Sequence, residues 1–525
     1  MHWFRAELPQ QAKLRYSPIA EFGLQTIERP KPPHEAPDSN AATALTNLLG
    51  GPAAPPLGYR SWAVFQWARD PFTLLITIYL FAPYFSGTVV GDPVRGQSLL
   101  GGANSLAGLI VALGAPFLGA IADKNGRRKP WILVLVVLAV PGLLLFWYTT
   151  PPGVDGVVPE ASVIAVTLIA MVVVSVALDF SAVFHNAMLP STAPAAKVGE
   201  VSGLAIALGN AAGVLLMLTV LYAFALPGTF DAAWLPAEPL FGLDKTASEH
   251  NRVVGPIVGV WLLVFSLPLF LFTPETSAGL PIRAAARAGL AEVWQTVRQA
   301  RRYGNVGLYL LARMLFNDGL VGVLIFSGVY AAGTFGWGTV ELLVIGIATS
   351  VSAGTGAFLG GLLDDRIGSK RTILLAVGGT TVLLATGVMI QPDAIFGVPH
   401  PEGQPLGSLP IYNTLPELLY FVNLQLFGMF VATGFAASRT MMARIAPREL
   451  MTQFFGLYAL SGTATAFLAP LIVAITTDAF QSQRAGYASL MLLLAAGFLV
   501  MLFVREERAV MASAADGLAA GPPGN

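Results

Sequence analysis

The stretch GAIADKNGRRKPW, residues 119–131, sets an acid, a glycine and four cations between two of the most apolar segments of the chain. One apolar run ends at Ala122, and Pro130 and Trp131 open the next. Cations are costly in lipid, so such a break between apolar runs is typical of a short loop that stays in water between two membrane spans.

Composition supports a membrane protein. The 525 residues are 55% hydrophobic and only 11% charged, with a mean hydropathy of +0.66. Soluble domains carry roughly 25% charged residues, so we expect lipid to solvate most of this chain. Thirty basic and 30 acidic residues cancel, which gives no indication of a nucleic-acid partner. Without cysteines the chain has no disulfides and no thiolate metal sites.

Twelve apolar segments are long enough to cross a bilayer, for which about 20 residues suffice. Residues 1–58 are polar and proline-rich, lack the apolar core of a signal peptide, and predict a low-order tail. The predicted spans are 62–86, 98–122, 130–149, 161–186, 202–226, 253–273, 305–332, 340–363, 372–390, 413–437, 453–476 and 485–504.

The basic residues predict the orientation. With a cytoplasmic tail, 24 of the 30 Lys and Arg fall in the tails and inner loops, four in outer loops and two inside spans. This positive-inside bias predicts that both termini are cytoplasmic. Residues 274–304, between spans six and seven, have a partial apolar stripe opposite five arginines. They predict either an amphipathic helix on the inner membrane face or a solvated connector.

The opening stretch recurs 242 residues later. Gly119, Asp123 and Gly126, followed by Arg127, have counterparts in Gly361, Asp365 and Gly368, followed by Lys370 and Arg371. WARDP (67–71) resembles FNDG (316–319), and NAMLP (186–190) resembles RIAP (444–447). The spacing predicts a repeat of six spans plus six.

Each residue type in this loop has a physical role. The glycines near the span end would let helices approach closely, and Gly126 and Gly368 would allow a tight turn. The aspartate could meet an arginine or a positive helix end and latch the halves together. A topology signal alone is the simpler interpretation, but two copies with the same spacing argue against it.

The pattern G-x-x-x-D-x-x-G followed by basic residues resembles the loop signature of the major facilitator superfamily, over roughly residues 60–505. SWAVFQWARDPF, FHNAMLP and the pair SRTMMARIAP and FFGLY are similar to the branch of fungal vacuolar amino-acid effluxers and their bacterial relatives. The chain departs from that branch at Gln66 and at Arg69–Asp70. The resemblance implies two six-helix bundles around a central cavity, and efflux of a small metabolite such as an amino acid.

Charged and polar groups at membrane depth are the candidates for substrate or ion coupling, because they usually face a cavity or one another. They are Arg69 and Asp70 in span one, Asp179, His185 and Asn186 in span four, and Arg313, Asn317 and Asp318 in span seven. Asn210, Asn423 and Gln425 are uncharged polar groups in apolar runs. Arg439, near the inner end of span ten, would serve a cytoplasmic gate.

Each candidate also has a structural interpretation. Asp70 with Arg69 or Arg313, and Asp318 with Arg313, could be neutralising pairs. Asp179 could be hydrated near the interface, and a lone His185 is more often a packing residue than a proton relay. The functional alternative is that Asp70 or Asp318 exchanges a proton with each side in turn and couples it to solute movement.

Proline and glycine inside spans predict broken helices around a central site, in span one (Pro71, Pro83), span two, span eight and span eleven (Gly462, Pro470). A membrane enzyme acting on prenyl or lipid substrates is the alternative from another class, but the doublet Asp364–Asp365 alone does not make its catalytic site. The sequence contains no hydrolase, zinc-protease or Walker motif. A receptor that keeps a transporter fold is a third alternative.

The sequence therefore predicts an all-α integral membrane protein with twelve transmembrane helices in the major facilitator fold. The expected parts are a tail (1–58), an N-terminal bundle (59–273), a connector (274–304), a C-terminal bundle (305–504) and a second tail (505–525). We expect a monomeric, non-enzymatic secondary transporter in a bacterial inner membrane, without cofactor or metal. Its partners would be the lipid bilayer, a small polar solute and, for coupling, protons, with sugar-like or drug-like solutes as the alternative.

Overall fold

The computed structural model describes residues 46–47, 49–154, 160–275, 279–281, 283–284, 304–407, 410–446, 457–458 and 460–506. Within helix α4 the side chains of residues 120 and 122–124 are outside the described part. Most of the predicted N-terminal tail, most of the connector 274–304 and nearly all of the C-terminal tail lie outside the described residues.

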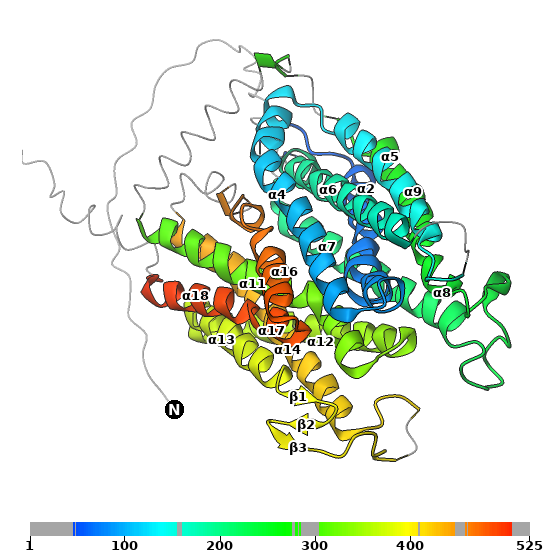
Figure 1. Cartoon of the computed structure of the whole chain (residues 1–525). Coiled ribbons are helices and arrows are strands. Elements are labelled where there is room, and N and C mark those ends of the chain that lie inside the picture. The colour runs from blue at the N-terminus through cyan, green and yellow to red at the C-terminus, as the bar shows by residue number, and fades with distance from the viewer. Residues whose placement is uncertain are drawn as a thin grey trace, which may run out of the picture.

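The first half of the chain forms one group of long helices (Figure 1). Its elements are α2 (Pro56–Pro71), η1 (Phe72–Tyr79), α3 (Phe81–Tyr84), η2 (Phe85–Val89), α4 (Pro93–Asn125), α5 (Lys129–Leu145), η3 (Phe146–Tyr148), α6 (Glu160–Thr192), η4 (Ala195–Lys197), α7 (Val198–Val220), η5 (Leu221–Ala225), η6 (Leu240–Gly242), α8 (Glu249–Arg252) and α9 (Val254–Phe272).

The second half forms another group, together with a small antiparallel sheet in the order β1-β2-β3. Its elements are α11 (Gly304–Phe335), α12 (Thr339–Ile367), α13 (Ser369–Gly387), β1 (Ile390–Gln391), β2 (Ala394–Ile395), β3 (Val398–Pro399), α14 (Leu415–Ile445), α16 (Leu468–Phe480), α17 (Gln483–Ala488) and α18 (Leu490–Phe503).

Eleven helical segments in the described chain are long and apolar enough to cross a membrane. The predicted ninth span is also helical, as α13, but it begins with Lys370 and Arg371 and is not among the eleven. Helix α13 packs between α14 and α18, so it occupies a place in the bundle like the others. The all-helical membrane fold predicted from the sequence is confirmed.

Contacts between helices follow the internal repeat. In the first half, α4 packs on α6, α5 packs on α6 and α9, and α2 packs on α9. In the second half, α12 packs on α14, α13 packs on α14 and α18, and α11 packs on α18. The halves meet through α4 against α16 and through α7 against α12, which are again corresponding pairs of spans.

We call the end of the molecule that carries residues 119–131 and 361–371 the motif face, and the opposite end the distal face. Hydrogen bonds between α4 and α16–α17, and from Thr339 to Asn251, join the two halves toward the distal face. In Figure 1 the two groups of helices run at an angle to each other and come together at the end where α8 and the sheet lie.

The predicted breaks in spans one and eleven are present. Helix α2 ends at Pro71, π-helical turns follow, and the backbone leaves helical geometry at Leu80 with φ −128°. Residues 464–467 form turns before α16 begins at Leu468. In contrast, α4 and α12 are continuous helices, because their glycines and Pro116 fit within a regular backbone.

The described part of the chain begins before the predicted end of the tail at residue 58. The backbone N–H of Ala54 donates to Thr192 O at 3.0 Å, and Asn47 Nδ2 donates to Ser191 O at 2.9 Å. These bonds satisfy carbonyl groups at the end of α6, which a helix terminus leaves unpaired, and so they fix residues 46–55 against the motif face.

Close helix packing in the second half depends on Gly356. A Cβ on this residue would lie 2.4 Å from Cα and O of Met429 on α14, whereas a Cβ on Gly354 would meet nothing within 4 Å. We therefore expect Gly356→Ala to force α12 and α14 apart and to cost about 1–3 kcal/mol of stability. The thermal unfolding midpoint in detergent measures this effect, with Gly354→Ala as the matched control. Equal midpoints for the two variants would contradict it.

Candidate functional site

Two candidate charges of the first half, Arg69 and Asp70, lie next to each other on α2. Asp70 Oδ1 accepts from Arg69 Nη2 at 3.1 Å, and both carboxylate oxygens accept from Gln66 Nε2, at 2.9 and 2.8 Å. The side chains of Arg69 and Asp70 are 20% and 24% exposed, so this pair is open to a solute rather than sealed in packing.

Gly209 on α7 makes room for this carboxylate. A Cβ at Gly209 would lie only 2.1 Å from Asp70 Oδ2 and 2.8 Å from Gln66 Cγ. Any other residue at this position would displace the side chain of Asp70. The sequence analysis missed Gly209, because nothing in the local pattern distinguishes it from the many other glycines of the spans.

Asp179 and Asn186 lie seven residues apart on α6, and both side chains are exposed. Seven residues are nearly two helical turns, so the two side chains share a face. Asp179 interacts electrostatically with Arg69, which places this face of α6 toward the charges of α2. Asp179 thus lies within electrostatic range of Arg69, on a helix that neighbours α2.

His185 has a packing environment. Its Nε2 lies 2.8 Å from Trp62 O, and Trp62 Nε1 donates to His185 O at 2.8 Å. The two rings stack with centroids 4.3 Å apart. Because a carbonyl only accepts, Nε2 carries the proton of a neutral imidazole. This reciprocal pair joins α2 to α6 and matches the structural interpretation of a lone histidine.

The charges of the second half are more enclosed. Arg313 on α11 is 7% exposed, lies over the Tyr458 ring at 3.6 Å, and donates through Nη1 to Tyr458 O and Ser461 Oγ, both at 2.6 Å. Asp318, one turn and a half further on, is 3% exposed and accepts from the backbone N–H of Ala469 at 3.0 Å. These contacts give Arg313 and Asp318 separate partners, in place of the neutralising pair considered above. Asn317 is half-buried between them in the sequence.

The four charged positions nearest the middle of the membrane lie at similar depth. Arg69, Asp70, Asp179 and Asp318 are thirteen or fourteen residues from the motif-face ends of α2, α6 and α11, which is about 20 Å at 1.5 Å per residue. Of these four, Asp318 in the second half is buried, whereas Arg69, Asp70 and Asp179 in the first half are accessible. The accessible side of the candidate site therefore belongs to the first half.

The repeated loop has the expected turn but not the expected packing. Gly126 and Gly368 have φ values of +76° and +88°, which favour glycine. However, a Cβ at Gly361 would meet nothing within 4 Å, and one at Gly119 would make only ordinary contact with Val183 at 3.6 Å. The close helix approach predicted for these two glycines instead occurs at Gly356 and Gly360.

The two adjacent acids in the second copy of this loop pair with Arg444 of α14, in the same half of the chain. Asp365 is 81% exposed and 3.9 Å from Arg444, while the buried Asp364 is 3.2 Å from the same guanidinium. Arg444 also bonds Glu506 at 2.8 Å. Arg439 is exposed on α14. The side chain of Asp123 is outside the described part, so the predicted latch has no described counterpart in the first half.

One acid at the end of each half caps the helix that follows the repeated loop. Glu275 accepts from the N–H groups of Arg128 and Lys129 at 2.9 and 3.2 Å. Glu506 accepts from the N–H groups of Ser369 and Lys370 at 2.8 and 3.0 Å. The sequence analysis missed both acids, although each directly follows the last span of its half.

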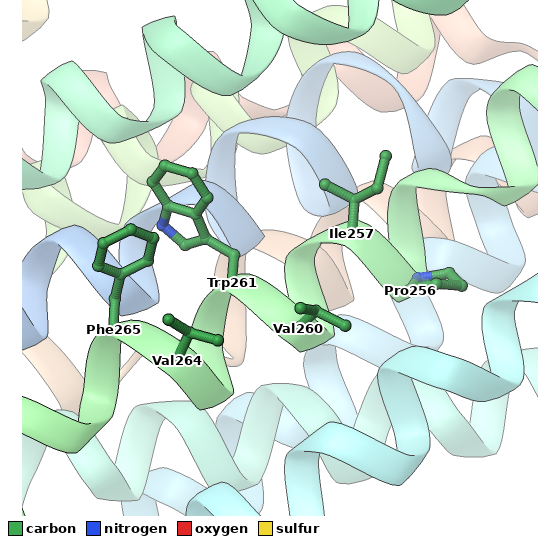
Figure 2. A pocket seen from close by; sticks show the side chains of 6 residues that line it. All are labelled: Pro256, Ile257, Val260, Trp261, Val264 and Phe265. Atoms are coloured by element: carbon green, nitrogen blue, oxygen red, sulfur yellow. The ribbon is translucent and has the colours of Figure 1, made fainter. Parts of the chain in front are cut away.

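An apolar groove lies along α9, lined by Pro256, Ile257, Val260, Trp261, Val264 and Phe265 (Figure 2). Val260 and Val264 are about half exposed, at 55% and 49%. All six residues belong to one helix, and none of them is charged. The groove is therefore separate from the charged candidates, and it suits lipid chains rather than a polar solute.

The family matches, a transporter relative and the fold together identify a major facilitator transporter of a small solute, and not an enzyme. The Major Facilitator Superfamily model matches residues 22–217. The chain belongs to the family described as "Vacuole effluxer Atg22 like", whose model matches residues 191–514. These matches confirm the family resemblance drawn from the repeated loop and from FHNAMLP and SRTMMARIAP.

Relatives agree with this assignment. An MFS-type transporter, YxiO of Bacillus subtilis, is 22% identical over 85% of this chain and 94% of its own length. Autophagy-related protein 22 of Yarrowia lipolytica is 22% identical over 59% of this chain, which spans about half the length of that fungal relative. The xylose transporter XylE from E. coli, in an inward open conformation, matches with a TM-score of 0.58 at 14% identity, over 88% of this chain and 98% of that one.

The Glu506 cap predicts a pH dependence of stability. Partial burial raises the pKa of Glu506, but the Lys370 and Ser369 N–H groups and the Arg444 guanidinium outweigh burial and hold this pKa below its ordinary value of 4.5. A lowered folded-state pKa contributes stability above the ordinary pKa, and this contribution disappears as the pH falls through the folded-state value. We expect Glu506→Gln to lower the unfolding midpoint at pH 7, and the gap to wild type to close below pH 4.5.

The control is Glu402→Gln, since Glu402 is exposed in the loop between the sheet and α14. Its midpoint should match wild type at every pH. A gap between wild type and Glu506→Gln that stays constant with pH would contradict the role of the charged cap.

Proposed function

We propose that this chain exports a small zwitterionic solute, such as an amino acid, by alternating access coupled to protons. The observation that carries the proposal is the group of Arg69, Asp70 and Asp179, accessible charges of both signs at one membrane level. Arg69 and Asp70 pair with each other at 3.1 Å but stay 20% and 24% exposed, whereas intramembrane charges with a purely structural role would be expected to be sealed in packing.

The chemistry of the group suits a solute with one carboxylate and one amine. The guanidinium of Arg69 offers a fork of donors to a carboxylate, and Asp70 or Asp179 offers acceptors to an ammonium group. Arg313 contributes less in this arrangement, because its guanidinium already engages Tyr458 and Ser461. Asn186 and Asn317 would bind neutral polar parts of the solute. Asp70 and Asp318 are the candidates for carrying the coupled proton.

The direction of transport rests on the family. The family description "Vacuole effluxer" favours export. A sugar-like solute is the second candidate, supported by the fold similarity to a xylose transporter. Drug-like solutes, and a receptor without transport, are further alternatives that the same assay separates.

We further propose that the motif face is cytoplasmic, with both termini on that side, in the inner membrane of a bacterium. The 24 basic residues that this orientation assigns to the inner side support it. The hydrogen bonds between halves at the distal face would then close the site to the outside. Such a state would take up solute from the cytoplasm, in agreement with export. The working unit would be a monomer.

Counterflow in proteoliposomes tests the solute class without knowledge of the coupling ion. We expect accumulation of a labelled amino-acid pool, and loss of accumulation in the Asp70→Asn, Asp318→Asn double mutant. Labelled dipeptides and sugars run in parallel. Accumulation of sugars alone would replace the amino-acid proposal with its alternative. Lack of accumulation from every pool would favour first a larger or more apolar, drug-like solute, and then the receptor.

A smaller change tests whether the position of Asp70 matters. Gly209→Ala places a methyl group against the carboxylate, whereas Gly203→Ala on the same helix places one in open space. We expect Gly209→Ala to reduce the counterflow rate by at least about tenfold, because 1 Å misplacements cost up to 10²-fold, and Gly203→Ala to leave it unchanged. Equal rates in the two variants, with comparable amounts of folded protein, would exclude Asp70 from the transport site.

A further inference from the structure

Span eleven is interrupted in the middle of the membrane. Residues 464–467 form turns, and α16 starts anew at Leu468. A helix start leaves backbone N–H groups without partners, and lipid supplies none. The preceding residue, Phe467, provides no side-chain cap. The N–H of Ala469 is paired instead with the carboxylate of Asp318 on α11.

This contact joins a charge to a helix dipole. The first turn of a helix carries partial positive charge that stabilises a nearby anion. Asp318 is 3% exposed, so solvent does little to screen the interaction. The two helices are close here as well, because a Cβ at Gly322 of α11 would lie 2.7 Å from the Cβ of Ala469. Asp318 therefore fixes the position of the start of α16.

The other side of α16 lies against the first half of the chain. A Cβ at Gly101 of α4 would be 2.9 Å from both Pro470 O and Ala474 Cβ, and one at Gly108 would be 2.8 Å from the N of Phe467. Ser98 Oγ donates to Ala474 O at 3.4 Å. Helix α16 thus connects Asp318 in one half to α4 in the other.

The distal end of this contact is a buried polar cluster. Gln97 of α4 is fully buried, and its Nε2 donates to Thr477 Oγ1 at 2.8 Å and to Gln483 O at 3.0 Å. Gln483 Nε2 donates in return to Pro93 O at 2.8 Å. We call Pro93, Gln97, Thr477 and Gln483 the distal gate, since they hold the ends of α4, α16 and α17 together.

We infer that Asp318 is a positioning residue for the distal gate, which it holds closed through α16. When it is ionised, the carboxylate caps the helix start, and α16 carries Thr477 to Gln97. Loss of the charge weakens the cap, frees the start of α16, and raises the population in which the distal gate is open. This inference rests on the proposed alternating access, and it assigns a mechanical role to one of the two candidate coupling acids.

Double electron–electron resonance on purified protein in detergent tests this role. The chain has no cysteine, so spin labels at Arg95→Cys and Gln481→Cys report only the distal ends, where both residues are exposed. We expect Asp318→Asn to increase the longer-distance, gate-open population by about fivefold or more. Gln97→Ala, which removes the gate bonds directly, should increase it too. Asp393→Asn, which neutralises an exposed carboxylate between β1 and β2, outside the candidate site, should leave the distribution as in wild type.

A wild-type distribution in Asp318→Asn would overturn the inference, whether or not Gln97→Ala shifts. The same holds for an equal shift in Asp393→Asn. Ala469→Pro keeps the carboxylate and removes the N–H that it binds, near a helix start where proline is tolerated, and it should reproduce the shift even if Asp318→Asn does not fold. Because this measurement needs no solute, lack of counterflow would disprove the proposed transport and leave the gate result standing.

Discussion

A carboxylate against the positive end of a helix is the interaction on which this structure depends. It occurs at the start of α5 through Glu275, at the start of α13 through Glu506, and at the start of α16 through Asp318. In water, such contacts contribute little, because solvent competes for both partners. At the membrane boundary and inside it, the N–H groups of a helix start have few other partners. The three acids therefore decide where these three helices can begin.

The sequence was sufficient to predict the architecture. Apolar length, the distribution of basic residues and the 242-residue repeat require only composition and spacing, and membrane solvation makes these unusually informative. The contact pattern between α2–α9 and α11–α18 follows the same repeat. The positive φ values of Gly126 and Gly368 also follow from local sequence, since tight turns of this kind favour glycine.

The site was less predictable, because its partners come from distant parts of the chain. Arg313 and Asp318 are five residues apart and looked like a pair. However, the hydrogen-bond partner of each lies in span eleven, about 150 residues away. The loop acid that matches the repeat is Asp365, but the buried one is its neighbour Asp364. Which of two adjacent acids faces Arg444 depends on the rotation of α12, and no local pattern fixes that rotation to within one residue.

The reciprocal bonds and stacked rings of Trp62 and His185 have a consequence for any rocking motion of the two halves. They join α2 to α6 through two buried hydrogen bonds, which oppose a separation of Arg69 and Asp70 on α2 from Asp179 on α6. In the binding site proposed above, these three groups would present a solute with similar spacing in both states of the transporter. A difference in solute affinity between the inward-facing and outward-facing states would then come from residues of the second half, which approaches these three groups in one state and moves away in the other.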